Sequence, residues 1–570
     1  MRKFVFALLF LAAGSAAALA DDAPKKMALV PEQPRTMEEV VRRVVDNENH
    51  MYGRMKEYSP LVETYIQNLK PDKELGEVPA GDKYFLGKAD FSKTVSLLSL
   101  TDTSSKGKKI FSGIGNFFSF AMQYLPDGFL QMIFIDTSGF DQQHYKFDYV
   151  RREFLGEVRC LVFDVTPLPK SGKGRFLGRI WVEDQDFNVV RFNGGYGGGG
   201  HSSWYFHFDS WRTNIQPGIW LPTFVYSEEK DLHYALTKKL EFKAQTRLWG
   251  YNLGHSAQEQ ELSKVLVESP VTDETTTAND LSPVQAQRQW DRQAEDNVAD
   301  RLQRLGLIAP KGEVDKILET VVNNLEVTNN LDIQPDVRCR VMTTTTLESF
   351  TLGHTIVLSR GLIDVLPDEA SLATVLAHEL SHVVLGHRLD SQFAFFDQLL
   401  VQDKDTFRHF GFARTPDEEV AANDKAMQIL ANSPYKNQLG NAGLFLQAMQ
   451  SRQKEIPNLI SAHLGNRVPA MQNLQAPAAT AADPKAPNAQ KIAALPIGGR
   501  VKMDPWNDKL EMIKSKPIGT IAEREKMPFE VTPFMPYLTR FGSDAAKPVA
   551  ASVTPPPDAN KPGDVAPAKP

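Results

Sequence analysis

Two histidines and a glutamate stand at the spacing that a zinc-binding hydrolytic helix requires. Residues 378–382 read H-E-L-S-H, inside an apolar, helix-favouring run from 371 to 388. On a helix, residues four apart lie about 40° apart around the axis and about 6 Å along it, so both imidazoles can reach one ion. The spacing predicts His378 and His382 as zinc ligands and Glu379 as the general base that holds the metal-bound water. The same pattern also arises by chance in long chains, so the rest of the ligand set must support it.

A tetrahedral catalytic zinc needs a third protein ligand and an open position for water. In the metzincin pattern, a glycine and a histidine follow the first histidine by seven and ten residues, where this chain has Leu385 and Arg388. His387 is nine residues after His378, so a continuous helix would carry it to the opposite side. The third ligand must therefore come from a second helix.

The segment 416–426, with the sequence P-D-E-E-V-A-A-N-D-K-A, predicts that second helix. Glu419 and Asn423 are four residues apart and share a face, and the small Ala422 would allow close approach to the first helix. Glu419 is the expected third ligand, with Asn423 hydrogen-bonded around the ligands. A solvated acidic first turn, favoured by the helix dipole, is another explanation for part of the segment. The alternatives for the third ligand are Glu418 and Asp424.

Length, charge and the N-terminus indicate a folded, exported protein. The 570 residues allow two to four domains, and 64 basic against 70 acidic residues, without a long basic run, give nucleic-acid binding no electrostatic support. Residues 1–20 predict a cleavable signal peptide, so we expect the protein in the bacterial periplasm or secreted. Cys160 and Cys339 are far apart and are expected in different domains, which favours two buried thiols over a disulfide.

Residues 36–255 predict a β-rich domain. Thr36 and Glu39 form a capping box that begins a first helix. From residue 59 to 242, short apolar or aromatic runs alternate with turn residues at the spacing of an antiparallel sheet or half-barrel. The glycine-rich run 194–200 does not open a helix, so it indicates a hairpin connection and not a phosphate loop.

The rest of the chain predicts a linker, a mainly helical domain and a tail. Residues 256–282 are polar and form the linker, residues 283–470 carry the zinc motif, and residues 471–570 are rich in proline and alanine. Within the tail, segments near 498–541 hold apolar and aromatic side chains that we expect to dock on a folded surface. Further expected elements are helices at 283–305 and 314–327 and strands at 335–345 and 354–359.

The helical domain resembles metallopeptidase family forty-eight, the HtpX-like, BepA-like and CAAX-prenyl-protease-like zinc peptidases. The matching motifs are S-R-G-L-I at 359–363, L-A-H-E-L-S-H at 376–382, E-V-A-A-N at 419–423 and I-S-A-H-L-G-N-R-V at 460–468. The resemblance implies a gluzincin-type site in which one Zn²⁺ per chain is held by His378, His382 and Glu419, with Glu379 as general base.

The same resemblance implies roles around the substrate. His463 and Arg467 would lie near the cleft and stabilise the oxyanion, and residues 354–359 would form the edge strand on which an extended polypeptide adds. Two departures are E-S at 348–349, where the family usually has Asn-Ala, and Leu464, where it has proline. These departures concern the substrate cleft and leave the metal ligands unchanged.

The β-rich domain resembles the curved sheet of LolA-like periplasmic lipoprotein carriers. The matching segments are F-L-G at 154–156, V-F-D-V-T-P at 162–167, G-R-I-W-V-E-D at 178–184 and W-L-P at 220–222. The resemblance implies an apolar concave face that binds a lipid, a lipoprotein or an extended peptide. A structural platform for the enzyme is an equal alternative.

Together these patterns predict a multidomain α+β protein, with an N-terminal antiparallel β half-barrel-like domain and a mainly α-helical gluzincin-type peptidase domain containing a small edge-strand sheet. The expected function is a zinc metalloendopeptidase that cleaves envelope or secreted proteins. The alternatives are a chaperone-like quality-control module with occasional proteolysis, a lipid or lipoprotein carrier with an accessory peptidase, and, most remotely, zinc hydrolysis of a non-peptide bond.

Overall fold

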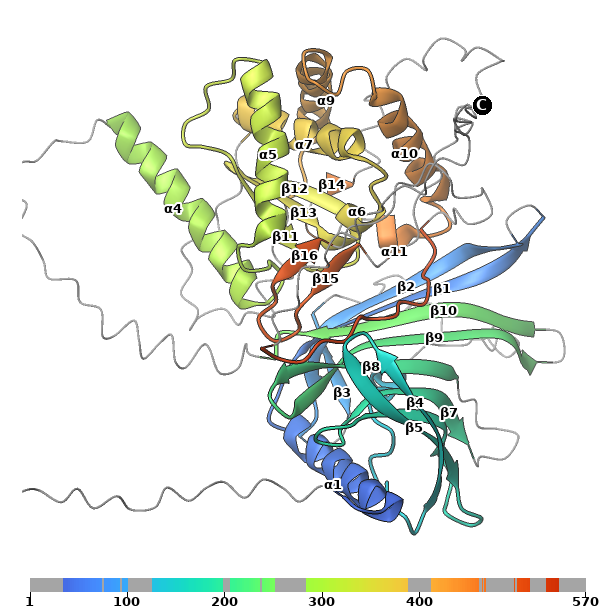
Figure 1. Ribbon diagram of the computed structural model, residues 1–570. Helices are drawn as coiled ribbons and strands as arrows, with labels where there is room; N and C mark the ends of the chain where they lie inside the picture. Colours follow the sequence, from blue (N-terminus) through green and yellow to red (C-terminus); the bar gives the residue numbers. More distant parts are fainter. Residues whose placement is uncertain are drawn as a thin grey trace, which may run out of the picture.

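The computed structural model describes two packed regions of the chain (Figure 1). The predicted signal peptide, the predicted linker, His463 and most of the tail lie outside the described residues. The described residues are 34–73, 76–92, 95–100, 126–197, 206–235, 238–251, 283–387, 412–460, 464, 466–467, 497, 500–512 and 529–542.

The N-terminal region is one large antiparallel sheet. Its strand order is β3-β2-β1-β10-β9-β8-β7-β6-β5-β4, and because the outer strands β3 and β4 do not pair with each other, the sheet is not closed. This confirms the mixed α+β class with a large antiparallel N-terminal sheet. The strands are β1 (Leu61–Asp72), β2 (Gly76–Asp90), β3 (Ser96–Ser99), β4 (Tyr145–Leu155), β5 (Val158–Pro167), β6 (Arg175–Glu183), β7 (Val189–Gly197), β8 (His207–Gln216), β9 (Ile219–Ala235) and β10 (Lys238–Trp249).

Two helices, α1 (Met37–Met55) and α2 (Pro126–Gln131), pack on one face of this sheet, which curves around α1 in Figure 1. Thr36 caps α1 as expected, because its hydroxyl accepts a hydrogen bond from the Glu39 N–H at 3.2 Å. Glu48 of α1 accepts two hydrogen bonds of 2.7 Å from the buried guanidinium of Arg212. Around this ion pair, buried aromatic rings of the sheet and of residues 126–140 fill the core. The face expected to take a lipid is therefore packed by the chain's own helices.

The second region is mainly helical and is built around α7. This helix is surrounded by α5, α9, α10, β12 and β13, and its residues from Ala370 to His382 are almost all buried. The helices are α4 (Pro283–Arg304), α5 (Glu313–Thr328), α6 (Arg360–Val365), α7 (Glu369–Val384), α9 (Pro416–Ala431), α10 (Leu439–Arg452) and α11 (Pro457–Ile460). The strands are β11 (Arg338–Met342), β12 (Glu348–Leu352), β13 (Thr355–Ser359), β14 (Asn466–Arg467), β15 (Val501–Met503) and β16 (Leu510–Met512).

The four-stranded sheet of this region corrects one prediction. Its order is β11-β13-β12-β14, so β13 (residues 355–359), expected at the edge of the sheet, is an interior strand. All five of its residues are buried, since β11 pairs with it in parallel and β12 pairs with it antiparallel. A continuous apolar strand such as this one is typical of an interior position. The edges belong to β11 and to the two-residue β14, which pairs with Glu348 and Ser349 of β12.

The two regions share one hydrophobic core. The face of the large sheet opposite α1 packs Tyr65 and Trp249 against residues of the helical region such as Val341 and Leu347. The indole N–H of Trp249 also donates a hydrogen bond of 2.9 Å to the carbonyl of Gly306. One face of the sheet thus belongs to the core of the helical region, while the other face belongs to a second core with α1 and α2.

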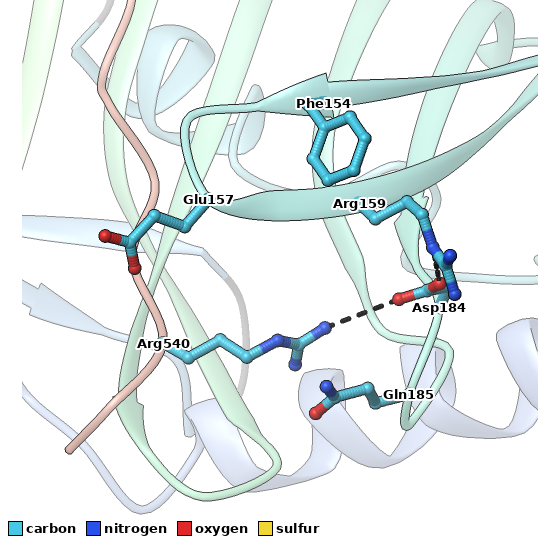
Figure 2. Close-up of a pocket in the computed structure, with 6 residues that line it drawn as sticks. All are labelled: Phe154, Glu157, Arg159, Asp184, Gln185 and Arg540. Carbon is cyan, nitrogen blue, oxygen red and sulfur yellow. Dashed lines mark hydrogen bonds and ion pairs between the residues drawn. The ribbon is translucent and has the colours of Figure 1, made fainter. Parts of the chain in front are cut away.

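Segments of the tail cross both regions (Figure 1). Arg360 of α6 donates two hydrogen bonds to the carbonyl of Val501, and Gln67 of β1 bonds the backbone of Phe529 and Val531. Further along, Arg540 contacts Glu183 at 2.9 Å and Asp184 at 3.7 Å. Figure 2 shows Arg540 beside a surface pocket that Phe154, Glu157, Arg159 and Gln185 also line.

Cys160 and Cys339 are both buried free thiols. Among the helices of the described residues, none combines the length and the apolar composition needed to cross a membrane.

Candidate metal centre

The helix α7 brings the two motif histidines together. Asp368 caps it by accepting a hydrogen bond of 2.8 Å from the Ser371 N–H. His378 and His382 are fully buried one turn apart, and their Nε2 atoms lie 3.2 Å from each other. Burial, followed by the neighbouring His378, lowers the pKa of His382 to about 2. The ring of His382 is therefore neutral, which is the form that binds a metal.

The helix α9 delivers the third side chain. The Glu419 Oε2 atom is 3.2 Å from Nε2 of His378, and its Oε1 atom is 3.7 Å from Nε2 of His382. Close approach is possible because fully buried alanines, at 422 and 426, lie on the inner face of α9. Asn423 is buried on the same face.

The two alternatives to Glu419 lie elsewhere. Glu418 belongs to the cap of α9, because its carboxylate accepts hydrogen bonds from the N–H and the hydroxyl of Thr415 at 3.0 and 2.9 Å. Asp424 is exposed to solvent. The structure therefore brings together His378, His382 and Glu419, whose ligand atoms all lie within 4.8 Å of one another.

The geometry of this cluster fits a zinc ion. In a tetrahedral site with metal–ligand distances near 2 Å, neighbouring ligand atoms lie about 3.3 Å apart. Here the two Nε2 atoms are 3.2 Å apart, the Oε2 atom of Glu419 is 3.2 Å from His378, and its other oxygen, Oε1, is 3.7 Å from His382. With one ligand atom from each residue, the three atoms lie within 4.8 Å of one another. Both carboxylate oxygens of Glu419 are buried and accept no hydrogen bond, a costly state for a carboxylate that a cation would relieve.

Glu379 lies next to the cluster and faces β12. Its two oxygens accept hydrogen bonds from the Ser349 hydroxyl at 2.6 Å and from the Thr351 hydroxyl at 2.5 Å. Burial raises the pKa of Glu379, while the nearby His378 and the two hydroxyls oppose that shift. Ser349 and Thr351 thus orient the expected general base. The alternation S-F-T in a buried strand was the signal in the sequence for this pair, because alternate residues of a strand face the same side.

His387 corrects a second prediction. Its Nδ1 atom lies 2.8 Å from Nδ1 of His382, and its N–H donates to the carbonyl of His382 at 3.0 Å. The expectation that His387 lies on the opposite side of the helix is wrong, because α7 ends at Val384 and Gly386, with φ +69°, turns the chain back. A glycine just past a helix commonly makes this turn. His387 therefore contacts the ring nitrogen of His382 that faces away from the cluster, where a partner sets the orientation of a ligand.

The two residues expected to stabilise the oxyanion are only partly placed. His463 lies outside the described residues, and Arg467 lies in β14, where its backbone pairs with Glu348 of β12. The carboxylate of Glu348 also accepts a hydrogen bond of 2.9 Å from the N–H of Leu464. The segment after His463 is therefore attached to the strand that orients Glu379.

Comparisons with known proteins cover parts of this chain. Residues 309–456 match the family model described as Peptidase family M48. No curated protein matches the chain. Among solved structures, a domain from Vibrio parahaemolyticus described as an outer membrane lipoprotein-sorting protein has 12% sequence identity, with 36% of this chain and 91% of that domain covered and a TM-score of 0.15. A TM-score this low supports no argument about the large sheet.

The family match spans α5, the four-stranded sheet except β14, and the helices α6, α7, α9 and α10. It confirms, over these residues, the resemblance that the sequence motifs indicate. Residues 309–456, which contain all three side chains of the cluster, are therefore similar to the metallopeptidases of family M48.

Proposed function

We propose that this protein is a zinc-dependent metalloendopeptidase. The observation that carries the proposal is the buried cluster of His378, His382 and Glu419, whose ligand atoms lie within 4.8 Å of one another and whose carboxylate oxygens accept no hydrogen bond. When bound, zinc would polarise the scissile carbonyl and lower the pKa of a water molecule. Glu379 would take a proton from the attacking water on a carboxylate oxygen and pass it to the leaving amine. Each oxygen keeps a second lone pair for this proton beside its hydrogen bond to Ser349 or Thr351.

The substrate is a polypeptide, as the peptidase family implies. We propose that it binds as an extended strand along β12, which among the described residues pairs with β14 at Glu348 and Ser349. Binding beyond Ser349 would replace the hydrogen bond of 3.1 Å that Arg414 donates to the carbonyl of Thr351. His463 and Arg467 are proposed to stabilise the oxyanion, which rests on the family resemblance. The predicted signal peptide, residues 1–20, supports export to the periplasm or secretion, and thus envelope or secreted proteins as substrates.

The substitution Glu379→Gln tests this function most directly. It removes the proton acceptor but no metal ligand, so we expect casein cleavage to fall at least about a hundredfold while one zinc per chain remains by atomic absorption. His378→Ala removes a ligand and should lose the zinc itself. Normal casein cleavage by the Glu379→Gln protein would show that the assignment is wrong.

A further inference from the structure

Two buried carboxylates of the large sheet reach into the peptidase region. Glu63 on β1 is 1% exposed and Asp82 on β2 is 5% exposed. A buried carboxylate requires several hydrogen-bond donors. Segments more than 200 residues away in the sequence supply two of the four donors to Glu63 and three of the four donors to Asp82.

Glu63 holds the loop that leads into β12. Thr345 donates to it twice, from its N–H and from its hydroxyl, each at 2.6 Å. Arg247, directly opposite Glu63 on β10, donates to Glu63 at 3.1 Å and to the Thr345 hydroxyl at 3.2 Å. Tyr84 donates to Glu63 at 2.9 Å. The ion pair of the sheet and the loop of the peptidase region therefore form one network.

The loop is also confined on its other side, by α6. The N–H of Gly361 donates to the carbonyl of Thr344 at 3.0 Å. A Cβ atom at Gly361 would lie only 1.8 Å from the carbonyl oxygen of Thr345. The loop thus lies between α6 and the sheet, and its backbone is packed closely against Gly361.

Asp82 is connected to the start of β12 through α11. Its carboxylate accepts hydrogen bonds from the N–H groups of Asn458 and Leu459 at 3.1 and 2.8 Å, which ties α11 to the sheet. The carbonyl of Leu459 in turn accepts a hydrogen bond of 2.8 Å from the N–H of Leu347. Leu347 immediately precedes β12, so both carboxylates act on the start of that strand.

The strand β12 presents its hydroxyls, on Ser349 and Thr351, to Glu379. A strand held at its start places these hydroxyls, and displacement of a catalytic group by about 1 Å can cost a hundredfold in rate. Resting on the proposed peptidase function, we infer that Glu63 and Asp82 are positioning residues that act through β12 on Glu379. The large sheet is on this view a part of the catalytic apparatus and not a separate carrier module.

The test replaces Glu63 in the full chain. Glu63→Gln keeps the shape of the side chain but loses the charge and one of the two accepting oxygens. We expect kcat for casein to fall about tenfold, or about 1.4 kcal/mol of barrier, with KM and zinc content unchanged. Asp82→Asn should act in the same direction.

Glu48→Gln is the matched control. Glu48 is also buried, and its carboxylate also forms an ion pair with an arginine of the sheet, Arg212, at an N···O distance of 2.7 Å. It lies on α1, at the opposite face of the large sheet. This variant should lose a similar amount of thermal stability and keep the wild-type kcat. A fall in kcat that is equal in both variants would overturn the inference, since it would reflect stability alone.

Two further measurements separate positioning from general weakening. If Glu63 acts on Glu379 through β12, Glu63→Gln should lower kcat less in a Ser349→Ala background than in the wild type. Strictly additive effects of the two substitutions on kcat would contradict this role of β12. Amide hydrogen exchange at residues 343–351 should be faster in Glu63→Gln than in Glu48→Gln. Unchanged exchange would overturn the inference.

The exchange measurement does not depend on activity. If the wild-type protein cleaves no casein, the proposed function fails, and the exchange data still decide whether the sheet positions β12. Should Glu63→Gln not fold, Thr345→Val replaces it, because it removes the hydroxyl of Thr345 while keeping the volume of the side chain. The same changes in kcat and exchange are then expected.

Discussion

The carboxylate of Glu348 accepts a hydrogen bond from the backbone N–H of Leu464 at 2.9 Å. These two residues are among the three positions at which the chain departs from the pattern that the family resemblance implies, with glutamate in place of asparagine at 348 and leucine in place of proline at 464; the third is Ser349, in place of alanine. A proline has no N–H to donate. These two departures therefore lie in one contact, in which the backbone N–H of Leu464 donates a hydrogen bond to the carboxylate of Glu348.

This pairing predicts non-additive stability. Leu464→Pro removes the donor of this hydrogen bond to a buried carboxylate, which should cost about 1–3 kcal/mol in the free energy of unfolding. Glu348→Asn in the same chain should recover part of that loss, because it removes the carboxylate. Urea titrations of the two single variants and of the double variant measure the coupling. An equal loss in the free energy of unfolding in the single Leu464→Pro protein and in the double variant would contradict this coupling.

Removal of zinc should lower thermal stability. The buried carboxylate of Glu419, without a hydrogen-bond donor, is stabilised when a cation binds, and a ligand at 100 times its Kd adds about 2.7 kcal/mol. We expect chelation to lower the Tm of the wild type by several degrees and added Zn²⁺ to restore it. The His382→Ala protein, which lacks one ligand, should show no response to either treatment.

His387 should tune zinc affinity without binding the metal. Its ring contacts Nδ1 of His382 at 2.8 Å, and loss of such a partner typically weakens metal binding about ten- to a hundredfold. Competition with a chromophoric chelator should show this weakening in His387→Ala. The control is His354→Ala, since His354 contacts Glu295 on α4 and does not approach the cluster. Equal zinc affinity in both variants would exclude the role of His387.

Asp508 should make stability depend on pH. Burial, with the charge of Asp504, raises the pKa of Asp508 from 3.8 to about 7, although the Gly250 N–H opposes the shift. The folded state thus holds the proton more tightly than the unfolded state, so the free energy of unfolding falls as the pH rises from about 4 to about 7.

Asp508→Asn should remove this pH dependence. Asparagine can still accept the hydrogen bond from Gly250 and tolerates the positive φ of 56° at this position. We expect the Tm of the variant to exceed that of the wild type by a few degrees at pH 8 and to equal it near pH 4. The exposed Glu511 provides a control, since Glu511→Gln should leave the Tm unchanged both at pH 8 and near pH 4. A Tm difference that is the same at both pH values would contradict the prediction.

Local spacing in the sequence was enough to predict the helix that carries the candidate metal ligands. His378, Glu379 and His382 follow from the period of an α-helix alone. The cap at Thr36 marks where α1 begins, and the segment that starts at Pro416 marks where α9 begins. The candidate Glu419 needed a second helix, which the segment 416–426 predicts. These features depend on hydrogen bonds and side-chain neighbours within a few residues, so they can be inferred without knowledge of the fold.

Other features depended on how distant segments pack. The interior place of β13 results from the parallel pairing of β11, and the position of His387 results from the end of α7 at Val384. The contact of Glu63 with Thr345 joins residues 282 apart in the sequence. No local period encodes such a contact, because two buried polar groups become partners only when hydrophobic burial has brought their strands and loops to one place.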